Sequence, residues 1–553
     1  MTFDFKKHHD DLLFVPLGGS NEVGMNLNLY TTQGKWLMVD CGIGFAGDWL
    51  PGVDVMVPDI SAFLPYKDQL LGLVLTHAHE DHLGAVPYLW RDLECPIYAT
   101  PFTAAFLRHK ITEMGPGKRP VIHEIKPGGK AELAPFSIEM IDLTHSIPEM
   151  QAVAIRTPKG VVMHTGDWKF DEVPLIGPVS NYDALKTYGD GKVLAMVCDS
   201  TNVFESGESG SEGEVRKHLV ELIGKCEQRV VVATFASNLA RVASLIQAAD
   251  EAGRMVALAG RSLHRIVEAA RQVGYLSESI EFIDEREVMN LPRKDVMIIC
   301  TGGQGEPRAA LPRIARGEHP NIRLQPGDTV VLSSRKIPGN EARINRFINQ
   351  FVMRGIEVIT DRNRMIHVSG HPARDELKRM YSLVRPQIAV PTHGEARHLH
   401  EHAKLARELG VKEAVEAYNG AVVWLEPGEA SVIGKLQAGY VAIDGNSLIP
   451  TEGEIMRARR KLRDDGAIFL TLVLDAQNQP VDMQLSAPGV LDREQDADLA
   501  EECLAELGHA VKNMPKRASD EALAEVARTT LRKRLKLELD KKPVLEVHVV
   551  RVA

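Results

Sequence analysis

Short apolar runs separated by polar turns fill the first part of the chain. LLFVPLGG, MNLNLYTT and KWLMVDCG read as strands between residues 12 and 42. GGSNEVG, which joins the first two, is a tight turn rich in Gly and Asn. More apolar runs follow at short spacing, with few helical stretches between them. We therefore expect one sheet packed on another, with functional side chains in the loops at the strand ends.

The pattern changes after residue 205. ESGESGSEGEV is rich in Gly, Ser and Glu, and it predicts a flexible boundary. Strands then alternate with helices, which predicts a parallel α/β sheet. From about residue 365 the chain returns to motifs at strand ends, in HVSGHPARDEL and IAVPTHGEARHL. The predicted order is a first domain in two parts, 1–205 and 363–450, an α/β insertion at 206–362, and a small α+β domain at 455–553.

The bulk composition narrows the class of protein only slightly. The chain has 553 residues, too many for one compact core. Its 44% apolar and 25% charged residues are ordinary for a globular protein. The formal charge of −10 is mild evidence against a nucleic-acid substrate, although a local basic groove can still bind phosphates.

The cysteines and the apolar runs indicate a cytoplasmic protein with no membrane segment. The six cysteines form no CxxC motif, which favours buried reduced thiols over disulfides or a cysteine zinc site. The N-terminal stretch MTFDFKKHHDD lacks the apolar core of a signal peptide. No apolar run approaches the ~20 residues that a membrane-spanning helix needs.

The densest group of chemically active side chains is HAHEDH, residues 77–82, after the apolar run LLGLVL. Because a strand alternates its faces, we expect His77 and His79 to point the same way. Asp81 and His82 lie at the turn into a helix and can face a second position nearby. These four potential ligands are too many for one tetrahedral ion and suit two adjacent ions. Glu80 points elsewhere under this geometry, which indicates a structural role.

Three later side chains stand at strand ends and can complete a metal site. His145 follows FSIEMIDLT, Asp167 follows GVVMHTG, and His393 follows IAVPT. A carboxylate can bridge two cations, which an imidazole cannot, so Asp167 suits a shared position. Each residue alone is also compatible with packing, and the combination with HAHEDH is what indicates metal binding. His164 lies within its strand, where packing is the expected role.

These motifs resemble the ribonuclease J family, in the β-CASP group of the metallo-β-lactamase superfamily. The resemblance runs from about residue 12 to the C-terminus. It is carried by GGSNEVGMN, LTHAHEDHLGA, THSIPE, TGDWKFD, CDSTN, ATFASN, SSRKIPGNE, HVSGH and PTHGE. The implied fold is α/β: a metallo-β-lactamase αββα sandwich with an inserted β-CASP α/β domain and a small C-terminal α+β domain. The resemblance also implies association through that last domain, as a homodimer or homotetramer.

The resemblance implies two zinc ions, with manganese or magnesium as alternative occupants. Two ligand sets follow from it, the first made of His77, His79, His145 and Asp167, the second of Asp81, His82, Asp167 and His393. The family often has Gly where Thr144 and Ala78 stand here. Both departures are small, and we withdraw no ligand for them.

The resemblance also implies catalytic roles for Asp81, Asp199 and His371. His371, oriented by Asp199, is the candidate for protonating the leaving oxygen or for holding a phosphoryl oxygen. A turn-capping role is the alternative for Asp199, since Asp-Ser-Thr-Asn favours turns. The implied activity is hydrolysis of RNA in maturation and decay, by a 5′-to-3′ exonuclease that prefers 5′-monophosphate ends and also makes endonuclease cuts.

A 5′-phosphate pocket needs hydroxyl and backbone N–H donors. The candidates that fit the motifs are Ser237, Ser334, Ser369, Gly370 and His371. Ser333 and Asn340 are further candidates, and turn capping in a Gly/Pro turn is a nearly equal alternative for them and for Ser334. Arg241, Arg261 and Arg265 either follow the RNA backbone or are solvated helix charges. RARRKLR at 457–463 either contacts RNA or forms a linker helix.

Two rival functions remain open at this point. A small-molecule metallohydrolase, such as a thioesterase or lactonase, also uses a motif like HAHEDH, but it has no need of an inserted domain. A non-catalytic RNA-binding or assembly subunit on the same scaffold is the other alternative. Lost ligands would mark it, and all seven are present here.

Overall fold

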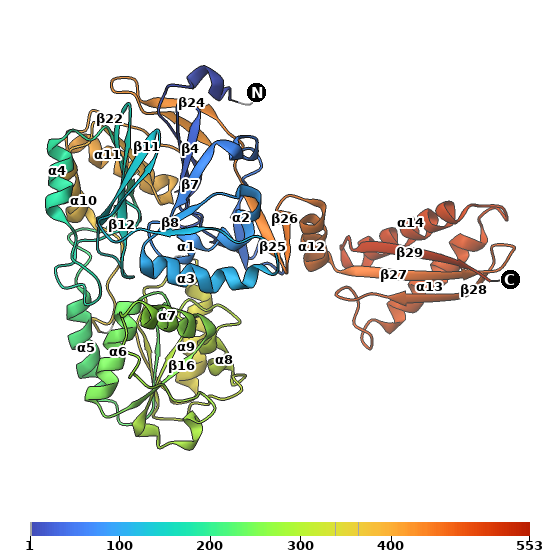
Figure 1. Ribbon diagram of the computed structural model, residues 1–553. Coiled ribbons are helices and arrows are strands. Elements are labelled where there is room, and N and C mark those ends of the chain that lie inside the picture. The colour runs from blue at the N-terminus through green and yellow to red at the C-terminus, as the bar shows by residue number, and fades with distance from the viewer. Residues whose placement is uncertain (1–2, 338, 363, 553) are drawn as a thin grey trace. The chain divides into compact units, whose positions relative to one another are not determined.

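The computed structural model describes residues 3–337, 339–362 and 364–552 (Figure 1). The chain forms two compact units. The first joins Met1–Gly44 with Val57–Gly439, and the second joins Phe45–Met56 with Tyr440–Ala553. Each unit has its own sheets and its own apolar core.

The second unit begins at Tyr440, within the stretch that the strand pattern assigns to the first domain. It also includes the short segment 45–56 from the N-terminal part. Packing explains this division, because Leu50 and Val53 are buried against Ala442 in a small apolar cluster. Such a contact joins positions far apart in the chain, so local periodicity carries no sign of it.

Two large sheets form the main body of the first unit. The order of the eight-stranded sheet is β24 (Ser431–Lys435), β23 (Ala421–Trp424), β1 (Leu13–Gly18), β3 (Leu27–Thr32), β4 (Lys35–Val39), β7 (Leu70–Val74), β8 (Ile97–Ala99) and β9 (Ile122–Glu124). The order of the seven-stranded sheet is β10 (Lys130–Leu133), β11 (Phe136–Asp142), β12 (Gln151–Thr157), β13 (Gly160–His164), β14 (Ala195–Asp199), β20 (Ile388–Thr392) and β22 (Glu413–Ala414). A short pair, β2 (Ser20–Asn21) and β21 (Gly394–Glu395), lies outside both.

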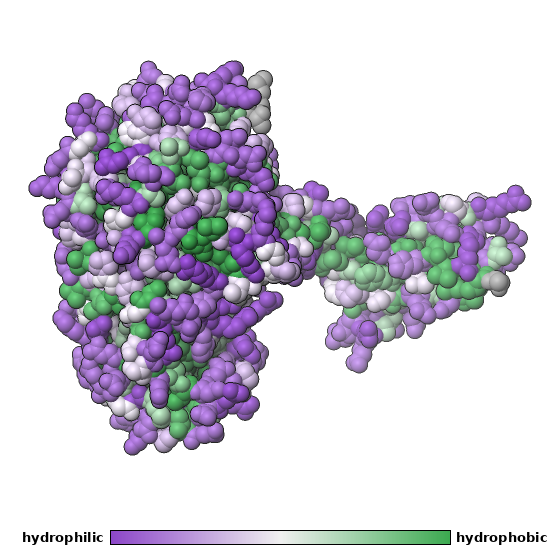
Figure 2. Space-filling view, in the orientation of Figure 1, coloured by the Kyte–Doolittle hydropathy of each residue, from purple (hydrophilic) through white to green (hydrophobic). Residues whose placement is uncertain are grey.

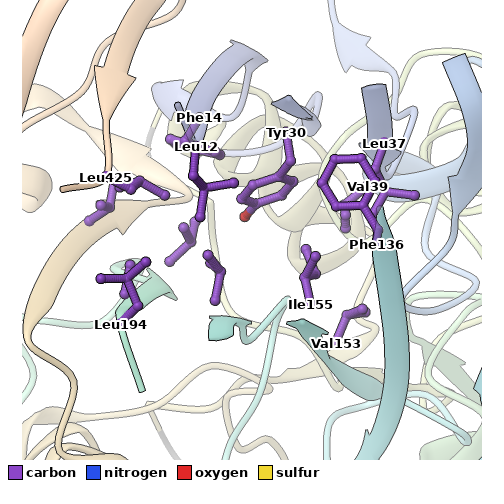
Figure 3. Packing of buried hydrophobic residues seen from close by; sticks show 14 of the residues in the cluster. Leu12, Phe14, Tyr30, Leu37, Val39, Phe136, Val153, Ile155, Leu194 and Leu425 are labelled. Atoms are coloured by element: carbon purple, nitrogen blue, oxygen red, sulfur yellow. The ribbon is translucent and has the colours of Figure 1, made fainter. Parts of the chain in front are cut away.

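One apolar core joins the two large sheets (Figure 3). Phe14 and Leu37 enter it from the eight-stranded sheet, and Phe136 enters it from the seven-stranded sheet. Trp36, one residue before Leu37, belongs to the opposite face, where its ring packs against Phe63 with centroids 5.4 Å apart. This alternation is the period-two pattern expected of strands covered on both faces.

Helices cover the outer faces of the two sheets. On the seven-stranded sheet, α4 (Tyr182–Asp190), α10 (Arg374–Val384) and α11 (Ala396–Glu408) bury apolar residues in a second core cluster. On the other sheet, the 3₁₀ helix Leu64–Gln69 packs on β4, and α2 (Val86–Leu93) packs on that helix. α1 (Glu80–Leu83) precedes α2, and α3 (Pro101–Ile111) follows β8. The predicted sandwich with helical outer layers is confirmed.

A separate parallel sheet is inserted between two neighbouring strands of the sandwich. β14 and β20 pair in parallel, with Val197 opposite Val390, so the chain leaves after β14 and returns at β20. The inserted sheet has the order β16 (Met255–Ala259), β17 (Val296–Cys300), β15 (Val230–Ala233), β18 (Thr329–Leu332) and β19 (Glu357–Ile359). Its helices are α5 (Glu212–Gly224), α6 (Leu239–Glu251), α7 (Arg261–Gln272), α8 (Ala310–Arg316) and α9 (Glu341–Met353). The predicted α/β insertion is therefore confirmed.

The Gly-, Ser- and Glu-rich stretch before the insertion is held by buried carboxylates. Glu376 accepts hydrogen bonds from the backbone N–H and the hydroxyl of Ser209, at 2.8 and 3.0 Å. Asp171 accepts from the Ser211 hydroxyl at 2.7 Å and from the Glu212 N–H at 2.9 Å. The prediction of a flexible boundary is wrong here, because partners distant in the sequence fix its backbone.

The second unit contains a three-stranded sheet covered by two helices. Its order is β28 (Pro480–Ser486), β27 (Ala467–Leu474) and β29 (Val544–Arg551). The helices α13 (Ala497–Lys512) and α14 (Asp520–Leu539) share its core cluster, as the amphipathic pattern predicts. Its remaining elements are the strands β25 (Tyr440–Asp444) and β26 (Ser447–Pro450), which form a sheet with β5 (Gly44–Phe45) and β6 (Val55–Pro58), and the helix α12 (Glu454–Asp465).

Hydrophilic side chains cover most of the face seen in Figure 2. Hydrophobic residues lie among them along the second unit. Phe469 on β27, Val481 on β28 and Val550 on β29 are large apolar side chains that remain exposed there. Among the described helices, none combines the length and apolarity that crossing a membrane requires.

Candidate metal centre and its surroundings

The ligands predicted in HAHEDH lie in a loop and in the helix that follows it. β7 ends at Val74, so His77 and His79 stand beyond the strand. Asp81 and His82 are in the first turn of α1. Strand alternation is therefore the wrong reason for expecting the two histidines to point the same way. They nevertheless converge, with 3.0 Å between His77 Nε2 and His79 Nδ1.

The backbone of this loop is fixed by neighbouring strand ends. The Asn26 N–H donates to the carbonyl of Asp81 at 2.8 Å, and the Cys41 N–H donates to that of His82 at 2.6 Å. A Cβ at Gly42 would lie 1.7 Å from the Asp81 carbonyl oxygen, so only glycine allows this close approach. The loop that contains Asn26 and the residues directly after β4 thus hold the backbone of the ligand loop in place.

The first predicted ligand set surrounds a common point. His79 Nδ1 lies 3.0 Å from His77 Nε2 and 3.0 Å from His145 Nε2. Asp167 Oδ2 lies 4.0 Å from the Nε2 atoms of His77 and His145. Around a tetrahedral ion with bonds of about 2.0–2.1 Å, ligand atoms are separated by about 3.3 Å. The observed distances bracket that value.

The second predicted ligand set lies on the other side of the same carboxylate. Asp167 Oδ2 is 3.1 Å from His82 Nε2 and 3.7 Å from His393 Nε2. Asp81 Oδ2 is 3.3 Å from His393 Nε2 and 3.7 Å from His82 Nε2. In each set all ligand atoms lie within 4.8 Å of one another. The structure therefore brings all seven predicted ligands together, with Asp167 common to both sets.

Asp167 itself shows that the residues fit cations. The residue is 2% exposed, and its Oδ1 atom is buried with no hydrogen-bond partner among the described residues. Leaving a carboxylate oxygen buried and unpaired is costly, so this oxygen calls for a cation or a donor that the protein does not supply. Imidazole and carboxylate ligands suit zinc, and they also suit manganese.

Partners outside the centre orient two of the imidazoles. His82 Nδ1 lies 2.7 Å from Asp40 Oδ2, and His145 Nδ1 lies 2.6 Å from the carbonyl oxygen of Gly370. Each contact engages the outer ring nitrogen, which leaves Nε2 free to face the centre. Our sequence reasoning missed Asp40. Its position at the end of a strand, in VDCG, is the signal that could have revealed it.

His393 is held in an unusual backbone conformation. Its φ of 50° lies in the left-handed region, which bulky side chains rarely adopt. The His393 N–H donates to the carbonyl of Gly19 at 2.6 Å, and Nδ1 lies 2.7 Å from the Thr201 hydroxyl. Contacts on both sides thus impose a strained conformation that aims Nε2 at the centre. Thr201 is a second orienting residue that the sequence analysis did not single out.

Electrostatics separate the two ligand sets. Burial lowers the pKa of His77 and His145 well below the usual histidine range, and it lowers the pKa of His79 to about 4. Burial also opposes protonation of His82 and His393, but the surrounding carboxylates, Asp167 first among them, together outweigh it and raise their pKa well above that range. The first set thus contains neutral imidazoles, whereas the second retains protons that an arriving cation must displace.

Asp199 and His371 form a pair at the edge of the centre. Asp199 Oδ2 lies 2.8 Å from His371 Nδ1, and Asp199 Oδ1 accepts from the N–H and hydroxyl of Thr201 at 2.9 and 2.7 Å. Burial lowers the pKa of His371, but the charges of Asp199 and Asp167 outweigh it and raise that pKa above its ordinary value. With Asp167 and His393 the pair forms a third cluster of possible ligands. Both Asp199 oxygens already have partners in the protein, since Oδ2 contacts His371 and Oδ1 accepts from Thr201.

The predicted phosphate-pocket residues fall into three situations. Ser369 and His371 are partly exposed and adjacent, with the His371 N–H donating to the Ser369 hydroxyl at 3.2 Å. Gly370 uses its carbonyl oxygen to hold His145. Ser237 is partly exposed on the insertion, in the turn before α6, whereas Ser334 is buried beside Gln304. The sequence motifs predict one phosphate pocket. These hydrogen bonds connect only part of it, the segment from Ser369 to His371.

Arg241 does not follow RNA and is not solvated. It is fully buried, and its guanidinium donates to Glu212 at 3.0 and 3.1 Å. The same group donates to the Ser333 hydroxyl at 2.6 Å and to the carbonyl of Ile366 at 2.8 Å. Both alternatives for Arg241 are therefore wrong, and Ser333 is buried with it. Through these contacts Arg241, on α6, is joined to α5, to the residue after β18 and to the residue before HVSGH.

Other basic candidates have ordinary surroundings. Arg261 is exposed on α7, and Arg265 is partly buried on the same helix. The RARRKLR run forms most of α12, where Arg459 pairs with Asp444 at 2.6 Å and Arg463 pairs with Asp464 at 2.7 Å. These ion pairs favour the linker-helix interpretation over contact with RNA.

Two side chains near the ligands have the structural roles predicted for them. The Glu80 carboxylate accepts from the Lys110 ammonium at 2.8 and 2.7 Å, away from the ligand atoms. His164 is buried, and its Nδ1 lies 2.8 Å from the Tyr30 hydroxyl. Neither belongs to the ligand clusters found among the described residues.

Family profiles match four successive segments of the chain. A beta-lactamase superfamily domain matches residues 35–185, and the beta-CASP domain of ribonuclease J matches 227–351. A Zn-dependent metallo-hydrolase RNA specificity domain matches 355–418, and the ribonuclease J C-terminal domain matches 454–552. Together they span the sandwich, the insertion and the second unit.

Curated relatives and a solved structure agree with these profiles. A ribonuclease J of Sinorhizobium meliloti is 42% identical over 99% of both chains. A ribonuclease J of Thermus thermophilus is 35% identical over 84% of this chain and 82% of its own. A protein of unknown function from Enterococcus faecalis shares the fold, with a TM-score of 0.53, 15% identity, and coverage of 75% of this chain and 100% of that one. The chain therefore belongs to the ribonuclease J family, and it is a metal-dependent hydrolase whose substrate is RNA.

Proposed function

We propose that this ribonuclease hydrolyses RNA phosphodiesters with two zinc ions, one in each ligand set. Asp167 carries the proposal, because its Oδ2 atom faces both sets and its Oδ1 atom is buried without a partner among the described residues. Bound cations of this kind acidify water and offset the charge of a phosphoryl group, which lets hydroxide attack phosphorus in line. Manganese and magnesium are the alternative occupants.

In this proposal the Asp199 and His371 pair supplies the proton for the leaving 3′ oxygen. Asp199 faces His371 Nδ1 at 2.8 Å, so the proton available for transfer stands on Nε2. Asn202 donates to the carbonyl of His371 at 3.0 Å and to the Ser369 hydroxyl at 2.7 Å, which keeps this loop in place. Protonation of the 3′ oxygen gives products with a 5′-phosphate and a 3′-hydroxyl.

Ser369, with Ser237 on the insertion, is the candidate for recognising a 5′-monophosphate. The Ser369 hydroxyl already accepts from Asn202, so its own proton is available for an oxygen of the phosphate. A terminal monophosphate fixed there would set the first phosphodiester at the metal centre, which describes a 5′-to-3′ exonuclease. Internal cuts need no terminal phosphate, so endonuclease activity is compatible with the same centre.

The test compares RNAs that differ only at the 5′ end. We expect 5′-monophosphorylated RNA to be degraded faster than its 5′-triphosphorylated and 5′-hydroxyl forms, with loss of activity in chelator and recovery on adding zinc. Ser369→Ala should reduce the preference, whereas Ser382→Ala, a matched change at an exposed serine on α10, should not. Equal rates for all three ends, unchanged by Ser369→Ala, would overturn the pocket. Products with 3′-phosphates would overturn the chemistry.

We also propose that the second unit mediates homodimer or homotetramer formation in the cytoplasm. Phe469, Val481 and Val550 expose 45%, 61% and 44% of their surface on its three strands. The six free cysteines fit a reducing compartment. Light scattering of Phe469→Glu against the unchanged protein tests the association, since a charge at a buried contact would separate the copies. An unchanged mass would exclude this surface as the contact.

A further inference from the structure

Phe204 is an exposed aromatic ring on a turn whose preceding residues are buried. Its side chain is 51% exposed, whereas Asn202 and Val203 are 7% and 0% exposed. Hydrogen bonds from the Val203 N–H to the Ser200 carbonyl, at 3.1 Å, and from the Glu205 N–H to the Asn202 carbonyl, at 2.8 Å, define the turn. The ring therefore faces water because of the turn geometry.

The backbone on both sides of Phe204 is held by one arginine. Arg374 donates from its guanidinium to the carbonyl of Val203 at 3.3 Å and from its N–H to that of Glu205 at 2.9 Å. The guanidinium is itself fixed by Glu401 at 2.7 Å. The ring is thus presented from a fixed backbone, which reduces the conformational entropy that binding to it would cost.

The same turn is part of the surroundings of the metal centre. Thr201, three residues before Phe204, contacts both His393 and Asp199. Asn202 donates to the Ser369 hydroxyl and to the His371 carbonyl. The turn that carries Phe204 is thus joined directly to residues of the proposed catalytic site.

A cation and a second ring accompany Phe204. The Arg397 guanidinium lies 5.9 Å from the centroid of the Phe204 ring, and the His398 ring lies 5.3 Å from it at an interplanar angle of 61°. Arg397 pairs with Glu395 at 2.8 Å and keeps 63% of its side chain exposed. An aromatic face for a base beside a cation for the backbone is the combination that binds single-stranded nucleic acid.

We infer that Phe204, with Arg397 beside it, is a stacking platform for one nucleobase of single-stranded RNA next to the cleaved phosphodiester. The inference rests on RNA hydrolysis at the proposed metal centre. Stacking covers an apolar face that is otherwise left in water, and every base offers a face, so the platform adds affinity without selecting sequence. Phe204 touches the substrate in this account and takes no part in bond breaking.

The test measures binding without cleavage. Chelator-treated full-length protein is titrated into 5′-monophosphorylated RNAs, each carrying 2-aminopurine at one position, and stacking is followed by fluorescence quenching. We expect quenching at one position near the 5′ end. Phe204→Leu should abolish that signal and raise Kd about fivefold or more, and Phe204→Trp should retain both. An abasic nucleotide at that position should raise Kd for the unchanged protein and have little further effect in Phe204→Leu.

The control variant is Phe469→Leu, which removes a phenylalanine of similar exposure, 45% against 51%, from the second unit. It should leave quenching and Kd unchanged. The inference is overturned by a Phe204→Leu variant that binds as the unchanged protein does, by additive effects of Phe204→Leu and the abasic nucleotide, or by equal effects of the two phenylalanine variants. Turnover is measured separately with metal restored, so a failure of the proposed hydrolysis appears in kcat and not in these binding data.

Discussion

The two ligand sets around Asp167 differ in charge, although they share a carboxylate. The first set combines it with His77, His79 and His145, and the second adds Asp81 to two imidazoles. Burial keeps the first three imidazoles neutral by lowering their pKa. In the second set the carboxylates outweigh burial and raise the pKa of both histidines. One centre therefore contains a position whose imidazoles are neutral and a position where protons compete with the cation.

The largest expected effect is at the shared residue. Asp167→Ala removes the proposed shared ligand of both sets, so we expect loss of both ions and a fall in kcat of at least about a thousandfold. Metal analysis of the purified variant, with kcat on 5′-monophosphorylated RNA, measures this. Asp142→Ala, at a partly buried carboxylate that pairs with Gln151 at 2.8 Å, is the matched control and should retain both ions. Full metal content in Asp167→Ala would contradict its assignment as the ligand shared by both sets.

Single-set variants should separate the two positions. His79→Ala affects only the first set and Asp81→Ala only the second, so each should lose one equivalent of metal. Because the proposed two-metal reaction needs both positions, each should reduce kcat about a hundredfold or more. Titration with zinc, followed by calorimetry, counts the sites that remain. Retention of two equivalents by either variant would mean that its residue is not a ligand.

A smaller effect is expected from the residues that orient ligands. Thr201→Val removes the hydroxyl that contacts His393 and Asp199. We expect about a tenfold loss of affinity for the metal of the second set, with the first set unchanged. Thr187→Val, at an exposed threonine on α4, is the control. Equal weakening of both sites would indicate general loosening of the fold.

The smallest effect concerns the order in which acid releases the ions. The pKa of His82 and of His393 is raised, so these groups take up protons first as the pH falls. The imidazoles of the first set have lowered pKa values and stay neutral to lower pH. The second set should therefore empty at a higher pH than the first. Metal content after dialysis at stepwise lower pH measures this, and simultaneous release would contradict the electrostatic difference.

The clustering of the candidate ligands was predictable because they are concentrated in local motifs. HAHEDH gathers several candidate ligands in one loop and the helix turn that follows it, and His145, Asp167 and His393 each follow a recognisable apolar run. These residues lie together although the geometric premise was wrong, because they converge from a loop and a helix turn and not from a strand. Alternation of strands and helices likewise predicts the inserted sheet, because periodicity reports which face of each element is buried.

The buried polar contacts between distant segments were not predictable. Arg241 lies in a largely apolar helix segment, LARVASLI, and only the fold brings Glu212 and Ser333 to it. Glu376 similarly fixes Ser209, in a stretch whose composition suggests flexibility. Local pattern reports propensity and burial, but a hydrogen-bond partner far away in sequence depends on the completed packing.

The most direct test of the account is to locate the ions by anomalous diffraction at the zinc absorption edge, using crystals of the zinc-loaded protein. We expect two peaks on either side of Asp167 Oδ2, one within bonding distance of His77, His79 and His145, the other beside Asp81, His82 and His393. A single peak, or a second peak held by Asp199 and His371, would contradict the assignment of the two ligand sets.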